Sequence, residues 1–246
     1  MNRILFEAHE VRDGRATFSD ARAAHVLEVL HDEVGQTLKT GVIDGLAGTS
    51  VIERIDGSSI TVRCVHETPS RPPWIDLVLA PPRPRAMKRL LPQLASMGVR
   101  RIFLVGAEKV EKAFWGAQLL KEEIYRPLLV DGLQQAGVTF MPTMHVEKNF
   151  ARFAKSRMDA VFADQPVKIV AHPYSPGESG AQRRGRDGVP VLAVGPEGGW
   201  TDGEVALLEE HGFVRMSLGP RILRTDPALV ALLGTLMQTY DNELQS

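Results

Sequence analysis

The first seventy residues alternate apolar and polar positions in short runs separated by turn residues. Residues 37–43, 50–56 and 59–66 are typical of strands, because glycines separate the runs and every second side chain of the last run is apolar. Ahead of them, residues 23–30 carry apolar side chains at helical spacing, and Ser19 stands where a helix cap is expected. Short strands with close turns favour a small β-barrel.

A different pattern begins after the proline-rich segment 69–73, where long apolar runs alternate with amphipathic helices. The runs are residues 74–80, 99–105, 159–163, 189–194 and 213–218. Continuous apolar strands between helices indicate an α/β domain with a parallel sheet. We therefore expect a barrel domain over residues 1–70 and an α/β domain over residues 71–246.

The helix expected after the first long run puts Met87, Leu90, Leu91 and Leu94 on one face. Pro92 lies inside this helix, and we expect it to kink or shorten the helix. The stretch 172–188, rich in proline, glycine, serine and arginine, is typical of a surface excursion between two strands.

The composition is that of a soluble globular protein, with 43% hydrophobic and 24% charged residues. No apolar run approaches the roughly 20 residues that cross a bilayer, and the amino-terminal residues do not resemble a signal peptide, so we expect a cytoplasmic protein. The single cysteine, Cys64, excludes an intrachain disulfide and a multi-cysteine metal site. The formal net charge of -1 hides local clusters of arginine and lysine that could meet nucleic acid.

Several common catalytic motifs are absent. The chain has no GxxxxGK loop followed by serine or threonine, no GxGxxG, no GxSxG and no HExxH. These absences argue against the usual nucleotide hydrolases, dinucleotide enzymes, serine hydrolases and zinc proteases. None of the seven histidines pairs with another at metal-ligand spacing, so we expect no metal.

One loop that could carry chemistry is GPEGGW at residues 195–200, directly after an expected strand. Pro196 keeps the preceding residue extended, and the glycines expose bare backbone that a flat ligand could approach closely. Thr201 and Glu204 then form a capping box for the next helix. Taken alone, the loop is slightly more typical of an ordinary strand-to-helix turn than of a ligand site.

A second loop, LGPRILRT at residues 218–225, follows the last expected strand. Apolar Ile222 and Leu223 are unusual in a loop unless they cover an apolar group such as adenine, and arginines flank them. Thr225 could cap the next helix. That helix carries an apolar stripe of Leu229, Leu232, Leu233, Leu236, Met237 and Tyr240. Because both loops leave carboxyl ends of neighbouring strands, where open α/β sheets bind ligands, the pair favours a ligand site over two plain turns.

The GPEGGWT and LGPRILRT motifs before a long terminal helix resemble those of the RsmE family, the 16S rRNA uridine N3-methyltransferases of the SPOUT class. Further likeness covers most of the chain. It includes residues 24–30 with 34–35, residues 80–84, residues 98–99 and residues 135–137.

The resemblance implies a trefoil-knotted, parallel α/β catalytic domain after a PUA-like barrel. It implies S-adenosylmethionine as cofactor, a homodimer, and 16S rRNA or the small ribosomal subunit as substrate. The residues that would hold the cofactor are Gly195, Pro196, Glu197, Gly198, Gly199, Leu218, Gly219, Pro220, Ile222, Leu223 and Thr225.

Methylation of uridine N3 requires loss of the imino proton, so charge develops on the uracil oxygens. Arg224, with Arg221 beside it, is the candidate to stabilise this charge. Glu197 or Asp226 could accept the proton, and for Glu197 we favour the alternative role of holding the glycine loop in shape.

The candidates for RNA contact are Arg3, His25, Arg83, Arg85 and Lys88. The last three begin the second domain together with Arg89. The sequence indicates about equally that this basic cluster contacts RNA phosphate or that it is the solvent-exposed face of a helix. Two functional alternatives stay open. One is a SPOUT methyltransferase for tRNA or 23S rRNA, and the other is a catalytically silent RNA-binding or ribosome-assembly protein.

Overall fold

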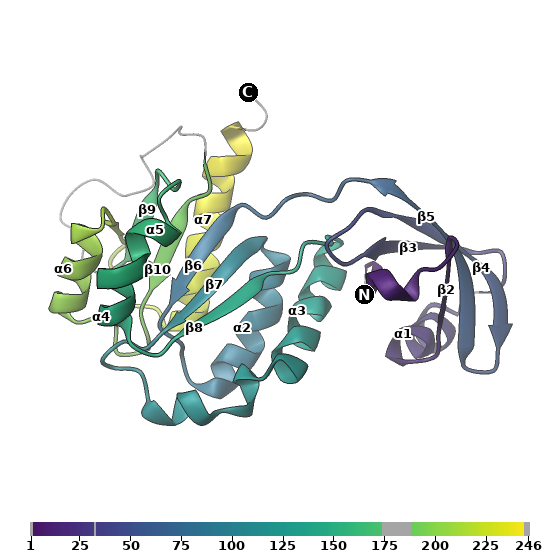
Figure 1. The fold of residues 1–246 in the computed structure, drawn as a ribbon, viewed down its shortest axis with the longest axis horizontal. Coiled ribbons are helices and arrows are strands. Elements are labelled where there is room, and N and C mark those ends of the chain that lie inside the picture. The colour runs from purple at the N-terminus through teal and green to yellow at the C-terminus, as the bar shows by residue number, and fades with distance from the viewer. Residues whose placement is uncertain (1, 32, 174–187, 244–246) are drawn as a thin grey trace. The chain divides into compact units, whose positions relative to one another are not determined.

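The computed structural model describes residues 2–31, 33–173 and 188–243, with side chains as far as residue 238. Two compact units divide the chain (Figure 1). The first unit contains residues 1–72 and 129–141, and the second contains residues 73–128 and 142–246. The sequence predicted one continuous boundary near residue 70. The return of residues 129–141 to the first unit was not predicted.

The first unit is a curled five-stranded sheet in the order β1-β3-β4-β5-β2. Its strands are β1 (Ile4–Phe6), β2 (Arg15–Phe18), β3 (Thr37–Val42), β4 (Ala47–Asp56) and β5 (Ser59–Thr68). The three runs predicted as strands are confirmed as β3, β4 and β5. Their inward side chains, among them Ile52, Ile60 and Val62, pack with Phe6 and Phe18 into one apolar core.

The helix of this unit begins one residue later than predicted. Helix α1 (Ala21–Ala24) continues as a π-helical turn (His25–Leu30), and a 3-10 turn (Ala8–Glu10) precedes it. Asp20, not Ser19, caps it, because the Asp20 carboxylate accepts the backbone N–H of Arg22 at 2.9 Å.

The returning segment is tied to the sheet by polar contacts. The Arg3 guanidinium donates to the carbonyls of Thr40, Gly48 and Gly137, at 2.6, 3.0 and 3.0 Å. The Thr139 hydroxyl donates to the carbonyl of Gly45 at 2.7 Å. These contacts are made by residues far apart in sequence, which is why local patterns did not reveal them.

The second unit is a parallel six-stranded sheet in the order β11-β9-β10-β6-β7-β8. Its strands are β6 (Ile75–Leu79), β7 (Val99–Val105), β8 (Thr143–Glu147), β9 (Lys168–Ala171), β10 (Val191–Val194) and β11 (Val214–Met216). The parallel α/β class is confirmed. Among the runs, 74–80, 99–105, 189–194 and 213–218 are confirmed as strands.

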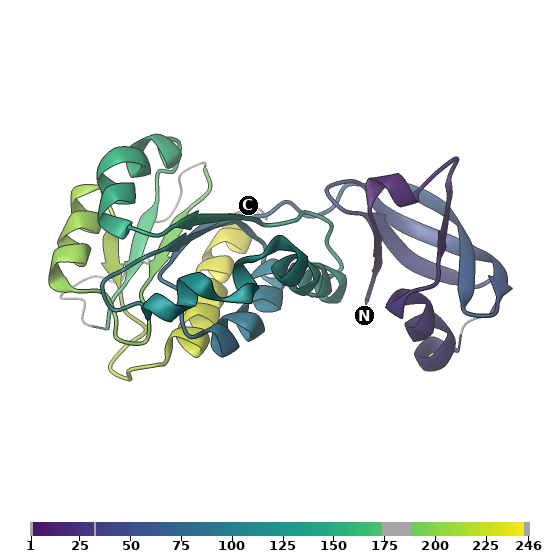
Figure 2. The ribbon, with the colours of Figure 1, turned by 60° about the horizontal axis from the view of Figure 1, so that its bottom comes forward.

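Helices cover both faces of this sheet, with α2 and α7 on one face and α4 and α6 on the other (Figure 2). Their bounds are α2 (Pro84–Ser96), α3 (Glu122–Ala136), α4 (Phe150–Phe153), α5 (Asp159–Val161), α6 (Asp202–Glu210) and α7 (Thr225–Glu243). Shorter turns are Lys112–Gly116, Gln118–Leu120 and the π-helical Ala154–Met158. Side chains beyond residue 238, including that of Tyr240, lie outside the described part, as do residues 174–187 of the expected excursion.

One strand expected for this unit is absent. Residues 159–163 are not a strand, because Phe150, Ala154, Met158 and Phe162 recur every four residues as the buried stripe of a helix. The strand of that region is β9, further along the chain. Helix α2 continues past Pro92 to Ser96, and the carbonyl that loses its hydrogen bond belongs to the exposed Lys88; the predicted kink stays a prediction.

A buried carboxylate organises the amino-terminal end of the sheet. Asp76 on β6 is 0% exposed, and Arg100 and Arg101 donate to it at 2.5 to 3.0 Å. Burial alone would raise the pKa of Asp76, but hydrogen bonds from Arg100 and Arg101 outweigh it and hold that pKa below its ordinary value. Folding therefore favours the ionised carboxylate.

We predict that Asp76→Asn lowers the free energy of unfolding by about 3 kcal/mol at neutral pH, because it leaves two arginines without their buried partner. Since the folded pKa is depressed, this stabilisation is present above about pH 4 and is lost as pH falls through the folded pKa. Urea titrations should show the difference from wild type shrinking in acid. Asp56→Asn, in an exposed pair with Arg54, should cost under about 1 kcal/mol; an equal loss in both variants would contradict the interpretation.

Candidate functional site

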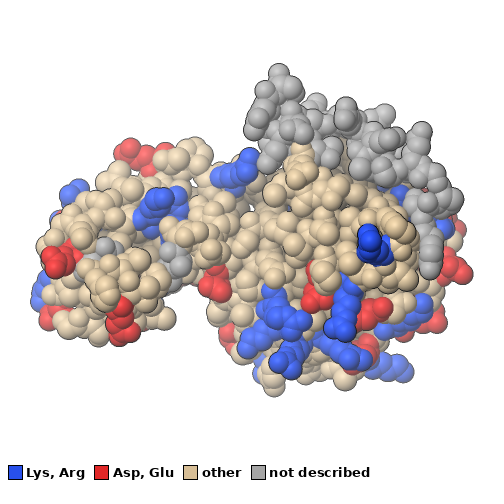
Figure 3. All heavy atoms as spheres, turned by 180° about the vertical axis from the view of Figure 1, so that it is seen from behind, with Lys and Arg blue, Asp and Glu red and all other residues tan. Residues whose placement is uncertain are grey.

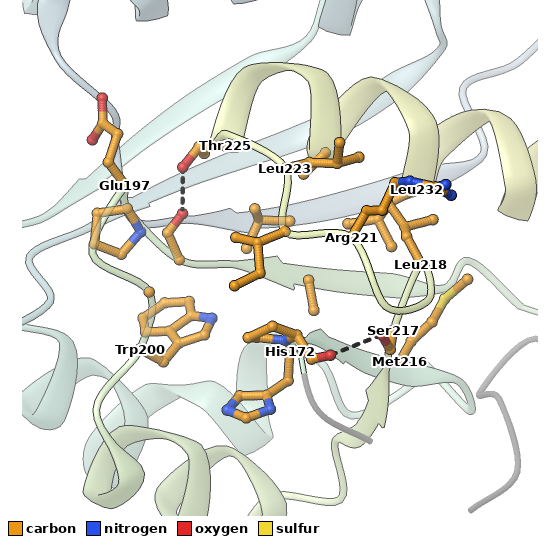
Figure 4. Close-up of a pocket in the computed structure, with 18 of the residues that line it drawn as sticks. His172, Glu197, Trp200, Met216, Ser217, Leu218, Arg221, Leu223, Thr225 and Leu232 are labelled. Atoms are coloured by element: carbon orange, nitrogen blue, oxygen red, sulfur yellow. Dashed lines mark hydrogen bonds between the residues drawn. The ribbon is translucent and has the colours of Figure 1, made fainter. Parts of the chain in front are cut away.

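A pocket of about 320 Å³ lies at the carboxyl ends of three neighbouring strands of the second unit (Figure 4). Loops after β9, β10 and β11 and the first turns of α7 line it. The lining residues are Ala171, His172, Pro173, Val194, Gly195, Pro196, Glu197, Gly198, Gly199, Trp200, Met216, Ser217, Leu218, Gly219, Arg221, Ile222, Leu223, Thr225, Ala228 and Leu232. The two sequence motifs thus meet around one space, with β9 between their strands.

The GPEGGW loop is a tight turn that needs glycine at its start. A Cβ added at Gly195 would lie 2.9 Å from the backbone nitrogen of Trp200, which is closer than van der Waals contact allows. Gly199 has a φ of +68° and donates its N–H to the carbonyl of Pro196 at 2.8 Å. The capping box predicted for the following helix is confirmed, since the Glu204 carboxylate accepts the backbone N–H of Thr201 and the Thr201 hydroxyl accepts the backbone N–H of Glu204.

Contacts from outside the loop hold it in place. The Glu197 carboxylate accepts the backbone N–H of Arg83 at 3.1 Å, and the Lys109 ammonium donates to the carbonyl of Gly198 at 2.9 Å. The hydroxyl of Thr225 donates to the carbonyl of Gly195 at 3.3 Å and joins the two motif loops. The predicted capping role of Thr225 is wrong, because its hydroxyl points across to the other loop while α7 already begins at this residue.

The second motif loop forms the opposite wall of the pocket and presents apolar side chains. Ile222 is 74% exposed although it lines the pocket, and Leu223 and Leu218 are also exposed. Ser217 accepts the N–H of Gly219 at 3.1 Å and donates to the carbonyl of Pro173 at 3.0 Å. The loop is therefore fixed at its base and exposed at its tip.

Most residues predicted to hold the cofactor line this pocket, and Pro220 alone among them does not. Of the catalytic candidates, Glu197 and Arg221 line it, while Arg224 is exposed and outside the lining. The sequence placed Trp200 in the first motif without a role of its own, and it did not indicate His172, Met216 or Ser217 as site residues. His172 begins the stretch predicted as a surface excursion, but the strand before it, β9, was misplaced, so the sequence did not connect this stretch with the site.

Trp200 is the buried residue of the lining that stands out chemically. Its side chain is 6% exposed and packs on Phe150, with ring centroids 5.1 Å apart. Its indole nitrogen Nε1 is buried and has no hydrogen-bond partner among the described residues. A buried donor of this kind is an unusual feature in a folded protein.

Basic residues gather where α2 begins, next to the pocket. Arg83 reaches Glu197 through its backbone and Glu111 through its side chain, and Arg89 pairs with Asp226 at 3.1 Å. Arg85 and Lys88 are exposed on the same helix. Figure 3 shows lysine and arginine side chains crowded at the lower end of this unit.

The candidates in the first unit are placed differently. The Arg3 guanidinium donates hydrogen bonds to three backbone carbonyls, and burial lowers the pKa of Arg3 below its ordinary value. His25 is half-buried, and its Nε2 lacks a hydrogen-bond partner within the described part of the chain. Neither residue can be linked to the pocket.

The described residues contain no group of three or more His, Cys, Asp or Glu side chains that could hold a metal ion. Within the same ranges, no helix is both long enough and apolar enough to span a membrane.

A family model described as an RNA methyltransferase domain matches residues 69–237. The chain belongs to this RNA methyltransferase family. A relative from Treponema pallidum, named ribosomal RNA small subunit methyltransferase E, is 29% identical over 251 residues, which cover 96% of this chain and 91% of that protein. The predicted family resemblance is confirmed.

Solved structures of similar fold agree. A protein from Legionella pneumophila, in complex with the bound cofactor S-adenosylmethionine, has a TM-score of 0.76 at 24% identity and covers 96% of this chain and 97% of its own. A ribosomal RNA small subunit methyltransferase E from Neisseria gonorrhoeae, bound to S-adenosylmethionine, has a TM-score of 0.74 at 21% identity and covers 97% of both chains. The predicted SPOUT-type fold class is confirmed, while the trefoil threading stays a prediction.

We predict that Gly195→Ala lowers the free energy of unfolding by about 1 to 3 kcal/mol, because the new methyl group forces the loop away from Trp200. Gly203→Ala is the matched control, since a Cβ there meets nothing within 4 Å and the site is in α6. It should leave stability equal or slightly higher. Urea unfolding of both variants tests this, and equal stabilities would show that residue 195 has room for a side chain.

Proposed function

We propose that this RNA methyltransferase transfers the methyl group of S-adenosylmethionine to N3 of a uridine in 16S rRNA. The observation that carries the proposal is the single pocket that both sequence motifs line. The family match and the name of the Treponema relative support ribosomal RNA as the substrate class. The choice of uridine N3 rests on the motif resemblance.

The pocket has the features that an adenosyl group requires. Val194, Ile222 and Leu232 offer apolar surface for the adenine ring, and the glycine loop offers backbone groups at close range. The unpartnered indole N–H of Trp200 supplies a buried donor. When bound, S-adenosylmethionine supplies a methyl group activated by its sulfonium.

The protein's own contribution is to position the uracil and stabilise its anion. Uracil N3 can attack only after it loses its proton, which places negative charge on the neighbouring oxygens. Arg221 lies in the wall of the pocket, and Arg224 follows three residues later in the same exposed loop. We assign the stabilisation of this charge to these two arginines.

Glu197 has a structural part in this proposal. Its carboxylate already accepts the backbone N–H of Arg83, which fixes the glycine loop against the start of α2. Asp226 is the other carboxylate at the site, and it is paired with Arg89. Either carboxylate could accept the imino proton, and Asp226 is the candidate that is not part of the glycine loop.

The exposed tip of the second motif loop supports a homodimer. Ile222, Leu223 and Leu218 present apolar surface to solvent beside the pocket, and a second copy of the chain would cover it. In this arrangement each active site is completed near the subunit interface, as the family resemblance implies.

RNA would reach the site over the basic start of α2, with the PUA-like first unit as a further RNA-binding domain. Arg85 and Lys88 are exposed there, and the contacts of Arg83 and Arg89 place this helix beside both motif loops. Phosphate contacts of this kind set affinity and salt dependence without choosing the base.

We predict that Arg221→Ala and Arg224→Ala each lower the rate of methyl transfer by about 100-fold or more, because an anion-stabilising donor is lost. Binding of S-adenosylhomocysteine, measured by calorimetry, should change little for Arg224→Ala, which is outside the pocket lining. Arg157→Ala is a control on the helix after α4, where the arginine pairs with Glu147. Near-normal transfer by both variants would reject the assigned role.

We also predict that the double variant Arg85→Gln with Lys88→Gln binds rRNA more weakly. The plot of log affinity against log salt concentration should become less steep by about 2, one for each lost phosphate contact. Cofactor binding should stay unchanged. Arg152→Gln with Lys155→Gln removes the same charge from an exposed stretch on the other face of the sheet. If both double variants change the slope equally, α2 has no special role.

The deciding experiment incubates the protein and labelled S-adenosylmethionine with unmodified small ribosomal subunits, and maps the label with nucleases. Label on N3 of a uridine in 16S rRNA supports the proposal. Label only on tRNA or 23S rRNA, offered in parallel, would favour the other methyltransferase reading. RNA binding without cofactor binding or label would favour a silent RNA-binding protein.

A further inference from the structure

The indole of Trp200 has a hydrogen-bonding capacity that the fold does not use. Its nitrogen Nε1 is buried and unpartnered among the described residues, and an indole N–H can only donate. Leaving such a donor buried and unpaired costs free energy, because the hydrogen bond that it made to water is lost on folding. Neither the strand before this residue nor the helix after it needs the indole nitrogen, because the capping box uses the side chains of Thr201 and Glu204.

The geometry of the loop directs this donor into the pocket. Trp200 lines the pocket while its ring packs on Phe150. Gly195 lies against the edge of the ring that bears the nitrogen, since a Cβ there would be 3.2 Å from Cδ1, the atom bonded to Nε1. Figure 4 shows the indole nitrogen on the side of the ring that faces the interior of the pocket.

The surroundings decide what kind of acceptor fits. Buried Val194 and Pro196 line the same pocket as Trp200, and Leu232 from α7 adds further apolar surface. A carboxylate taken out of water would need more than one neutral donor to compensate for its lost hydration. A ribose hydroxyl or an adenine ring nitrogen needs only one. The charged amino-acid end of a ligand fits better at the exposed wall, where Arg221 lies.

We propose that the Trp200 indole N–H donates a hydrogen bond to a neutral acceptor of the adenosyl group and so makes Trp200 a specificity residue for the nucleoside. The inference rests on the proposed cofactor site. Gly195 is then required for two reasons, since its missing side chain allows both the tight turn and the approach of the nitrogen-bearing edge to the ligand.

The test removes the donor and keeps an aromatic ring. Trp200→Phe should weaken S-adenosylmethionine, S-adenosylhomocysteine and 5′-methylthioadenosine by the same factor of about tenfold in calorimetry, because all three share the adenosyl group. Trp115→Phe is the control, as this half-buried indole is outside the pocket lining and its loss should leave all three affinities unchanged. Thermal unfolding without ligand checks that both variants fold.

A second measurement uses the wild-type protein and does not depend on the variant. The indole N–H resonance of Trp200, assigned by its absence in Trp200→Phe or by selective labelling, should move downfield when S-adenosylhomocysteine is added. The resonance of Trp74, whose Nε1 donates to the carbonyl of Met97 at 2.7 Å, should not move.

The outcomes separate this inference from the proposed function. Wild-type affinity in Trp200→Phe, or an unmoved Trp200 resonance in the complex, overturns the inference and leaves the cofactor site intact. A loss confined to the two ligands that carry an amino acid overturns the assignment to the adenosyl group and points to the carboxylate. Wild-type protein that binds none of the three ligands overturns the proposed site itself.

Discussion

The site depends on the close approach of residue 195 to Trp200. Because Gly195 has no side chain, the chain leaving β10 can turn back over the backbone of Trp200 and keep the indole buried against Phe150. The same approach leaves the carbonyl of Gly195 where the hydroxyl of Thr225 reaches it from α7. A larger residue would separate the two loops, and the pocket between them exists only while they are held together.

Around this contact, the pocket is held by residues from the start of α2 and the loop after β7. Arg83 and Lys109 fix the first motif loop, and Arg89 pairs with Asp226 at the start of α7. Each of these contacts is exposed and adds little stability by itself. Their value is geometric, because they set the positions of the two motif loops. The helix that carries the basic cluster is therefore also the helix that positions the pocket.

Sequence patterns predicted this arrangement where the signal was local. The runs that became β6, β7 and β10 are mostly apolar, and the capping box at Thr201 is readable from residue types alone. The two motif loops were found for the same reason, and most of their predicted residues line one pocket.

The errors arose where contacts between distant residues decide the structure. Residues 159–163 look like a strand until the buried stripe from Phe150 to Phe162 is known to face the core. Thr225 has the residue type of a cap, but the carbonyl of Gly195 takes its hydroxyl. Trp200 was visible in the motif, yet its unpartnered nitrogen depends on what packs around it, which no spacing rule contains.

Two buried polar groups at opposite ends of the second sheet show how structural and functional roles can be told apart. Asp76, at the amino-terminal end of β6, has its charge met by two arginines of the same unit. Trp200, beyond the carboxyl end of β10, has a donor that the described residues leave unmet. Both groups were removed from water on folding, and that loss must be balanced by a partner. Where the protein supplies the partner, as for Asp76, the group is explained by stability. Where the described residues do not supply it, as for Trp200, a ligand in the pocket is the partner that we propose.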